Sequence, residues 1–286
     1  MILVLKKILT AGLLPLLVGA GLCAVADAAP AKDAATVADA LPHTAAATLK
    51  AQAPKTDEPD LVSYPLVLEY HQITPVAHSD IDVSIENFKW ELDWLQDHNY
   101  KTLTLRKFIR CIDEHKPLPD KSVLITFDDG YQGVYQYALP ELRKRYMHAT
   151  LFLTTSSIGK KDKNYPRITV DQIHKMSRDY LVDLASHTVN HDELSKLSPD
   201  QCRYELQHSK AVLEDLTGKP CVALAYPYGD FNQQVLAATQ TAGYQVAFAG
   251  YSDAIASHLK RYTIPRIYVG EYVEKDNFKV FKQTMD

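Results

Sequence analysis

Short apolar runs alternate with amphipathic segments along most of this chain, and this alternation limits the possible folds more than any other feature of the sequence. The run 123–127 is almost wholly apolar, as expected of a strand that is covered on both faces. Similar short runs recur at intervals that leave room for a helix or a loop. The predicted strands cover residues 66–68, 123–127, 149–153, 181–185, 222–225, 244–248 and 264–269.

Capping residues mark several helix boundaries. Ser84 precedes a segment whose apolar residues are spaced four and three apart, which predicts a capped helix. Ser198 and Pro199 open a longer helix that ends near Gly218, because proline suits the first helical position and glycine the end. The other predicted helices cover residues 105–112, 134–146, 169–178 and 232–242.

Repeated strand–helix units predict an α/β protein with a parallel sheet, either open or closed into a barrel. The 286 residues, 46% hydrophobic and 23% charged, allow one folded domain, which we expect over residues 61–286. In either form of the sheet, functional residues gather at the carboxyl ends of the strands. Any motif found in the chain can be judged by that rule.

The N-terminus is typical of an exported protein. Lys6 and Lys7 precede an apolar run over residues 8–25, and Ala26-Asp27-Ala28 follows, which predicts a signal peptide over residues 1–28. The alternative is an uncleaved membrane anchor, since the run is close to the roughly 20 residues that span a bilayer. Residues 29–60 are rich in alanine and predict a flexible linker. We therefore expect a periplasmic or secreted protein.

The net charge of −4 and the pI of about 6.3 show no basic surplus of the kind that binds nucleic acid. The predicted mature chain keeps Cys111, Cys202 and Cys221. One disulfide plus a free thiol is one interpretation, and three buried thiols is the favoured one. No stable protein partner can be inferred from the sequence.

Two acidic residues, Asp128 and Asp129, follow the predicted strand 123–127 directly and precede Gly130. Adjacent residues that leave a strand point in different directions, so one carboxylate can bind a metal while the other faces a water molecule. Taken alone, the pair is more simply interpreted as a solvated turn.

Two histidines, His187 and His191, follow the predicted strand 181–185. Imidazoles four residues apart can meet one metal ion if the segment turns, although this spacing alone also fits two surface histidines. Both clusters fall at strand carboxyl ends and so at the same rim of the sheet. One aspartate and two histidines suit a divalent metal with open coordination positions.

A third segment, Tyr226-Pro227-Tyr228-Gly229, follows the predicted strand 222–225. Proline and glycine fix an irregular backbone, which could direct an N–H group at a reacting oxyanion. We expect Tyr226, Pro227 and Tyr228 to line a substrate groove. The alternative is an ordinary strand-to-helix turn.

Together these segments resemble the polysaccharide deacetylase family, that is, the NodB-homology domains of carbohydrate esterase family four. The resemblance covers residues 61–269, with motifs at 126–130, 186–191 and 227–229. It implies a deformed (β/α)7-type barrel in a single domain. It implies a metal held by Asp129, His187 and His191, with Asp128 as general base, and it implies that the Tyr228 backbone N–H helps to hold the oxyanion.

The chain departs from the family pattern at two places. Ala225 stands where the third motif usually carries the arginine that pairs with the base, and Arg266 is our candidate replacement, the alternative being a surface arginine. The histidine that usually forms part of the last motif is not visible in this sequence, so the motif does not identify the general acid. His71 follows the first predicted strand and is similar to a Tyr-His of members that act on poly-β-1,6-N-acetylglucosamine; we expect it to act as acid or substrate contact. His258 is a weaker candidate.

The resemblance predicts a metal-dependent hydrolase that removes N-acetyl groups from a polymer containing N-acetylglucosamine, and exopolysaccharide deacetylases of the biofilm type look closest. Zn²⁺ is favoured by the ligand set, with Co²⁺ or Ni²⁺ as alternatives. Two other functions stay open at this point. One is an esterase acting on O-acetyl xylan, and the other is a catalytically weak carbohydrate-binding barrel.

Overall fold

The computed structural model describes residues 65–250 and 260–270. The predicted signal peptide (1–28), the predicted linker (29–60) and His258 lie outside these residues. None of the helices in the described ranges is both long and apolar enough to cross a membrane.

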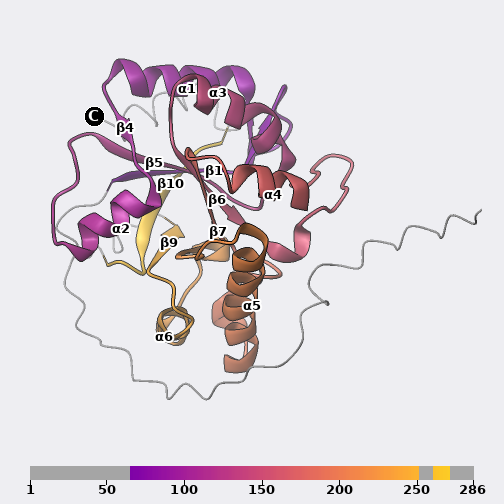
Figure 1. The fold of residues 1–286 in the computed structure, drawn as a ribbon. Coiled ribbons are helices and arrows are strands. Elements are labelled where there is room, and N and C mark those ends of the chain that lie inside the picture. Colours follow the sequence, from indigo (N-terminus) through magenta and orange to yellow (C-terminus); the bar gives the residue numbers. More distant parts are fainter. Residues whose placement is uncertain (1–64, 251–259, 271–286) are drawn as a thin grey trace, which may run out of the picture. The chain divides into compact units, whose positions relative to one another are not determined.

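Parallel strands form a closed barrel at the centre of the fold (Figure 1). Neighbouring strands follow the order β1-β10-β9-β8-β7-β6-β5, and β1 also pairs with β5, which closes the ring; β4 (Lys101–Thr102) pairs with β5 beside it. The predicted α/β barrel of the (β/α)7 type is therefore confirmed. The barrel strands are β1 (Leu66–Tyr70), β5 (Ser122–Phe127), β6 (Ala149–Leu153), β7 (Val182–Ser186), β8 (Ala223–Ala225), β9 (Val246–Gly250) and β10 (Ile264–Tyr268).

Helices surround this barrel (Figure 1). The α-helices are α1 (Ile85–Asp97), α2 (Leu105–Asp113), α3 (Leu139–Lys144), α4 (Val170–Met176), α5 (Pro199–Thr217) and α6 (Gln233–Thr241). Short 3-10 turns cover η3 (Thr155–Ser157), η4 (Leu194–Lys196) and η5 (Pro227–Gly229). The predicted caps are confirmed: the Ser84 hydroxyl accepts from the Asn87 N–H, Ser198 forms a capping box with Gln201, and Gly218 ends α5 with a φ of 66°.

Two details differ from the sequence prediction. The helix expected over 134–146 is a π-helical turn, η2 (Val134–Ala138), followed by the short α3, and Pro140 explains the change. Proline has no N–H to bond within a regular helix and its ring clashes with the preceding turn, which a wider turn relieves. A short parallel pair, β2 (Gln72–Thr74) with β3 (Asp82–Ser84), was missed because three residues carry no periodicity.

The core has two parts, one inside the barrel and one between the strands and the outer helices. Phe152 and Phe248 fill the barrel interior with their ring centroids 5.3 Å apart, and Phe108 of α2 packs on the same cluster. The cysteines at 111, 202 and 221 are all buried and unpaired, so the favoured prediction of buried thiols is confirmed.

Gly133, the residue before η2, allows β2 to approach the start of η2. A Cβ at this position would lie 2.0 Å from the Ile73 carbonyl oxygen and 2.5 Å from the Gln72 Oε1. We expect Gly133→Ala to lower the free energy of unfolding by about 1–3 kcal/mol, measured by urea denaturation. Gly250→Ala is the matched control, since Gly250 has no left-handed φ and a Cβ there would meet only the Gly229 Cα at 3.8 Å, an ordinary contact distance. Equal losses in the two variants would contradict the close-packing argument.

Candidate active site

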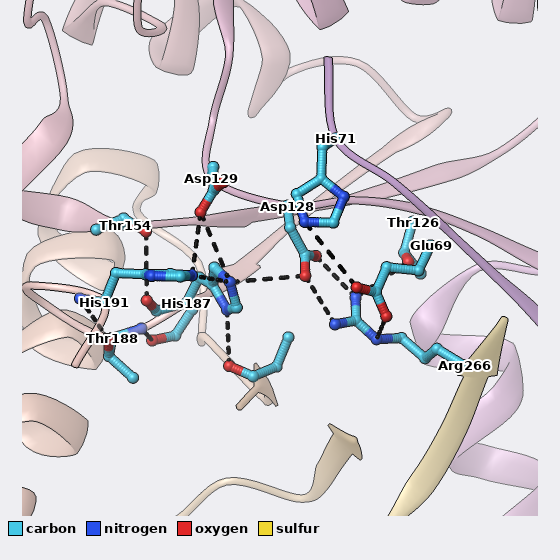
Figure 2. A network of polar contacts seen from close by, with 12 residues as sticks. Glu69, His71, Thr126, Asp128, Asp129, Thr154, His187, Thr188, His191 and Arg266 are labelled. Carbon is cyan, nitrogen blue, oxygen red and sulfur yellow. Dashed lines mark hydrogen bonds and ion pairs between the residues drawn. The ribbon is translucent and has the colours of Figure 1, made fainter. Parts of the chain in front are cut away.

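Polar side chains from several strands meet at the carboxyl rim of the barrel (Figure 2). Asp128 and Asp129 follow β5, while His187 and His191 follow β7. His71 follows β1. The structure thus brings to one place residues that lie far apart in the sequence.

Asp129, His187 and His191 direct their ligand atoms at a common point. Asp129 Oδ1 lies 3.7 Å from His187 Nε2 and 3.4 Å from His191 Nε2, and the two Nε2 atoms are 3.1 Å apart. The His187 Nδ1 donates to the Ala225 carbonyl oxygen at 2.8 Å, which leaves the Nε2 lone pair facing the cluster. Burial, and then the neighbouring His187, lower the pKa of His191 and favour its neutral form. This donor set fits a divalent metal.

A buried glutamate of α5 shapes the histidine loop. Glu205 Oε2 accepts from the Val189 and Asn190 backbone N–H groups at 2.8 Å each, and its Oε1 accepts from the Asn190 side-chain amide at 2.7 Å. These bonds hold the loop while His191 takes a φ of 65°. Sequence reasoning missed Glu205; the available indication was a charged residue on the apolar face of a helix.

The Asp129 backbone is held in a similar way. Asp129 has a φ of 67°, a backbone angle that residues other than glycine rarely adopt. The Arg167 guanidinium donates to the Asp129 carbonyl oxygen at 3.0 Å and lies 3.8 Å from the centroid of the Tyr131 ring. Arg167 was also missed, because nothing in the sequence ties a loop arginine to residue 129.

Asp128 lies between the His187 ring and Arg266 of β10: its Oδ2 is 3.6 Å from His187 Nε2, and both of its oxygens pair with Arg266. The Arg266 Nη1 and Nη2 donate to the two carboxylate oxygens at 2.7 Å each, and the two residues are 2% and 1% exposed. Burial would raise the pKa of Asp128, but Arg266 and then His187 outweigh it and hold that pKa below its usual range. The structure thus places Arg266 beside Asp128 and not on the surface.

His71 lies on the Asp128 side of the site (Figure 2). Its Nε2 is 4.0 Å from Glu69 Oε1, and its ring centroid is 5.5 Å from that of Tyr268. The His71 Nδ1 is buried and has no hydrogen-bond partner among the described residues. Glu69 itself was not singled out from the sequence, because a single acidic residue in a strand usually faces solvent.

The side chains of the Tyr-Pro-Tyr-Gly segment differ in exposure: that of Tyr228 is exposed, whereas those of Tyr226 and Pro227 are buried. Tyr228 is 71% exposed, has a φ of 59°, and its ring centroid lies 4.6 Å from that of His191. Tyr226 is fully buried and donates its hydroxyl to the Tyr262 carbonyl oxygen at 3.1 Å, and Pro227 is also buried. The expectation that Tyr226 and Pro227 line the groove is therefore corrected: their side chains support the loop from beneath.

A cavity of about 480 Å³ adjoins the metal-ligand cluster. Its lining includes Asp129, Tyr131, Lys160, Tyr165, Arg167 and His191. Its size is in the range of small-ligand sites. Because Asp129 and His191 are in its lining, a ligand in this cavity would contact two of the predicted metal ligands.

Residues 115–247 match the family model described as polysaccharide deacetylase. The chain is 31% identical over 231 residues to the Bacillus subtilis protein YxkH, a candidate polysaccharide deacetylase, covering 81% of this chain and 79% of that protein. It is 34% identical over 196 residues to a poly-β-1,6-N-acetyl-D-glucosamine N-deacetylase of Staphylococcus epidermidis, covering 65% of this chain and 68% of the relative.

Solved structures share the fold. The Streptococcus pyogenes deacetylase PplD, solved in complex with acetate, is 25% identical and has a TM-score of 0.66, covering 78% of this chain and 98% of PplD. IcaB from Ammonifex degensii is 24% identical and has a TM-score of 0.65, covering 77% of this chain and 97% of IcaB.

The hydrogen bonds of Glu205 lead us to expect an effect on metal affinity. We expect Glu205→Ala to weaken Zn²⁺ binding by about 10- to 100-fold, because the loop that carries the two histidines loses three hydrogen bonds. The measurement is competition with a chromophoric chelator. Asp200→Ala, an exposed position on the same helix, serves as the control and should bind Zn²⁺ normally. Unchanged affinity in a folded Glu205→Ala protein would contradict the prediction.

Proposed function

This chain belongs to the polysaccharide deacetylase family, and we propose that it is a metal-dependent hydrolase that removes N-acetyl groups from a polymer containing N-acetylglucosamine. One observation carries the proposal. Three metal-ligand side chains and a separate arginine-paired carboxylate lie side by side at the rim of the barrel. In metal-dependent hydrolysis of an amide, a Lewis acid polarises the carbonyl and a base takes a proton from the attacking water, and this arrangement would supply both.

The choice of polymer rests on the relatives. The Staphylococcus epidermidis relative is named for poly-β-1,6-N-acetyl-D-glucosamine, and the identity of 34% extends over two thirds of its length. The neighbouring cavity is lined by the half-buried Tyr165, whose ring offers a face on which a sugar ring can stack, whereas Tyr131 is buried with the Arg167 guanidinium over its ring. The charged side chains in the lining of this cavity can also form hydrogen bonds with the hydroxyl groups of a sugar. We take an N-acetylglucosamine polymer as the substrate.

Asp129, His187 and His191 would hold the metal, for which Zn²⁺ is favoured over Co²⁺ or Ni²⁺. A bound divalent ion polarises the acetyl carbonyl and lowers the pKa of a nearby water molecule. The His187 tautomer that the bond to the Ala225 carbonyl requires and the neutral form favoured at His191 both leave nitrogen lone pairs available for this role.

Asp128 would act as the general base. Arg266 keeps it ionised and fixes the plane of its carboxylate, so that it can take a proton from the attacking water. The Tyr228 backbone N–H would donate to the oxyanion that develops on the acyl oxygen, since Tyr228 lies on an irregular rim loop against His191. The amine that leaves must gain a proton, and His71, on the Asp128 side, is the group we assign to that step.

We further propose that the chain is exported, on the strength of the basic and apolar N-terminus and its Ala-x-Ala segment. An exported deacetylase would meet its polymer outside the cytoplasm. Detection of the mature protein in a periplasmic or culture fraction tests this step independently of activity.

The first test of the function is acetate release. We expect the purified protein with Zn²⁺ or Co²⁺ to release acetate from β-1,6-linked N-acetylglucosamine oligomers, and a chelator to abolish the release until metal is restored. Asp128→Asn should lower kcat by about 100- to 10,000-fold with metal still bound. Acetyl xylan is the comparison substrate. Faster release from xylan would replace the N-deacetylase proposal with an esterase, and no release from any polymer would favour a binding protein.

Arg266 gives a second test. We expect Arg266→Ala to lower kcat and to destabilise the fold by about 3–5 kcal/mol, because it leaves the Asp128 carboxylate buried without its partner. Acetate release and urea denaturation are the two measurements. Arg261→Ala, which loses only an ion pair with a half-exposed aspartate, is the control. A variant at position 266 with unchanged turnover would contradict the role.

A further inference from the structure

Glu69 sits between the two strands that supply the Asp128–Arg266 pair. Strand β1 pairs with β5 on one side, where Glu69 is level with Thr126, and with β10 on the other, where it is level with Tyr268. The Glu69 side chain is only 15% exposed. A carboxylate in this position costs desolvation free energy, so its retention calls for a partner.

The partner of Glu69 is the edge of the Arg266 guanidinium that Asp128 does not use. Arg266 Nε lies 3.2 Å from Glu69 Oε2, as a charge contact without hydrogen-bond alignment. Both terminal nitrogens meet Asp128, and Nη1 also lies 3.3 Å from the Thr126 hydroxyl. The guanidinium carbon is 5.5 Å from the centroid of the Phe152 ring. Asp128 thus meets the end of the guanidinium, Glu69 meets its Nε edge, and the Phe152 ring lies over one of its faces.

A guanidinium can pair with a carboxylate in two ways. End-on pairing uses Nη1 and Nη2, and side-on pairing uses Nε with one terminal nitrogen. The two geometries set the carboxylate plane differently. Glu69, by standing at the Nε edge, leaves only the end-on geometry to Asp128.

We propose that Glu69 is a positioning residue that acts through Arg266 to fix the orientation of the Asp128 carboxylate. The inference rests on the proposed function, since it takes Asp128 as the base. The other Glu69 oxygen, Oε1, is directed at His71 at 4.0 Å. Arg266 and Glu69 therefore join the two sides of the site, the base and the group that meets the leaving amine.

Burial raises the pKa of Glu69 above its usual range, although the neighbouring Arg266 lowers it in part. This balance agrees with a carboxylate that depends on the arginine for its charge. A merely structural Glu69 would neutralise Arg266 and support the fold, and its loss would lower stability without altering turnover by the folded protein. Only a positioning role predicts that kcat of the folded variant falls.

The experiment compares Glu69→Gln and Glu69→Met with the wild-type protein in acetate release. Gln keeps an acceptor without the charge, and Met keeps the length without an acceptor. We expect kcat to fall in the order wild type, Gln, Met, by about tenfold for Met, with KM changed by less than about twofold. In an Arg266→Ala background, Glu69→Met should change kcat by less than about twofold, because the two residues act as one unit. Glu114→Gln, an exposed glutamate that pairs with Lys116, is the control and should leave kcat unchanged.

A crystal structure of Glu69→Met tests the geometry without any activity. We expect the guanidinium to turn so that Nε takes one Asp128 oxygen. Retained end-on pairing, wild-type kcat in Glu69→Met, or losses that multiply in the double variant would each overturn the proposal. A wild-type protein that releases no acetate would instead defeat the proposed function, while the crystal structure would still decide the role of Glu69 in orienting the pair.

Discussion

The buried pair of Asp128 and Arg266 is the interaction on which the rest of the site depends. Each charge would be costly alone in the interior, and the bidentate geometry stabilises both. Asp128 directly follows β5 and Arg266 lies in β10, and these two strands do not pair with each other but both pair with β1. Closure of the barrel through β1 is therefore what brings the two charges together, and it places Glu69 between them.

The site divides at the peptide between residues 128 and 129. Asp129 turns toward the two histidines, and its left-handed backbone separates its carboxylate from that of Asp128. Of the two adjacent acids, Asp129 meets both histidines, while Asp128 meets Arg266 and one histidine, His187. Different surroundings for neighbouring carboxylates are a general way to give them different chemical roles.

Irregular backbone is concentrated at this rim. Asp129, Thr188, His191 and Tyr228 all have φ values between 59° and 67°. Such conformations persist where surrounding contacts hold them, and here those contacts include Glu205 under the histidine loop and Arg167 behind Asp129. At Gly229 a Cβ would lie 2.5 Å from the Gly250 backbone nitrogen, so the loop after β8 also depends on close approach to β9.

Local features of the sequence determined the strands, most helix ends and the three motif segments, because periodicity and capping act over a few residues. Ser84, Ser198 and Gly218 cap helices as their sequence context predicts. The resemblance to a family supplied barrel closure, which local patterns leave open. Only the tertiary structure decided that Tyr226 is buried, that Arg266 meets Asp128, and that Glu69 and Glu205 face inward. These outcomes depend on which strands become neighbours and on where each strand ends, and a shift of one residue turns a side chain to the other face.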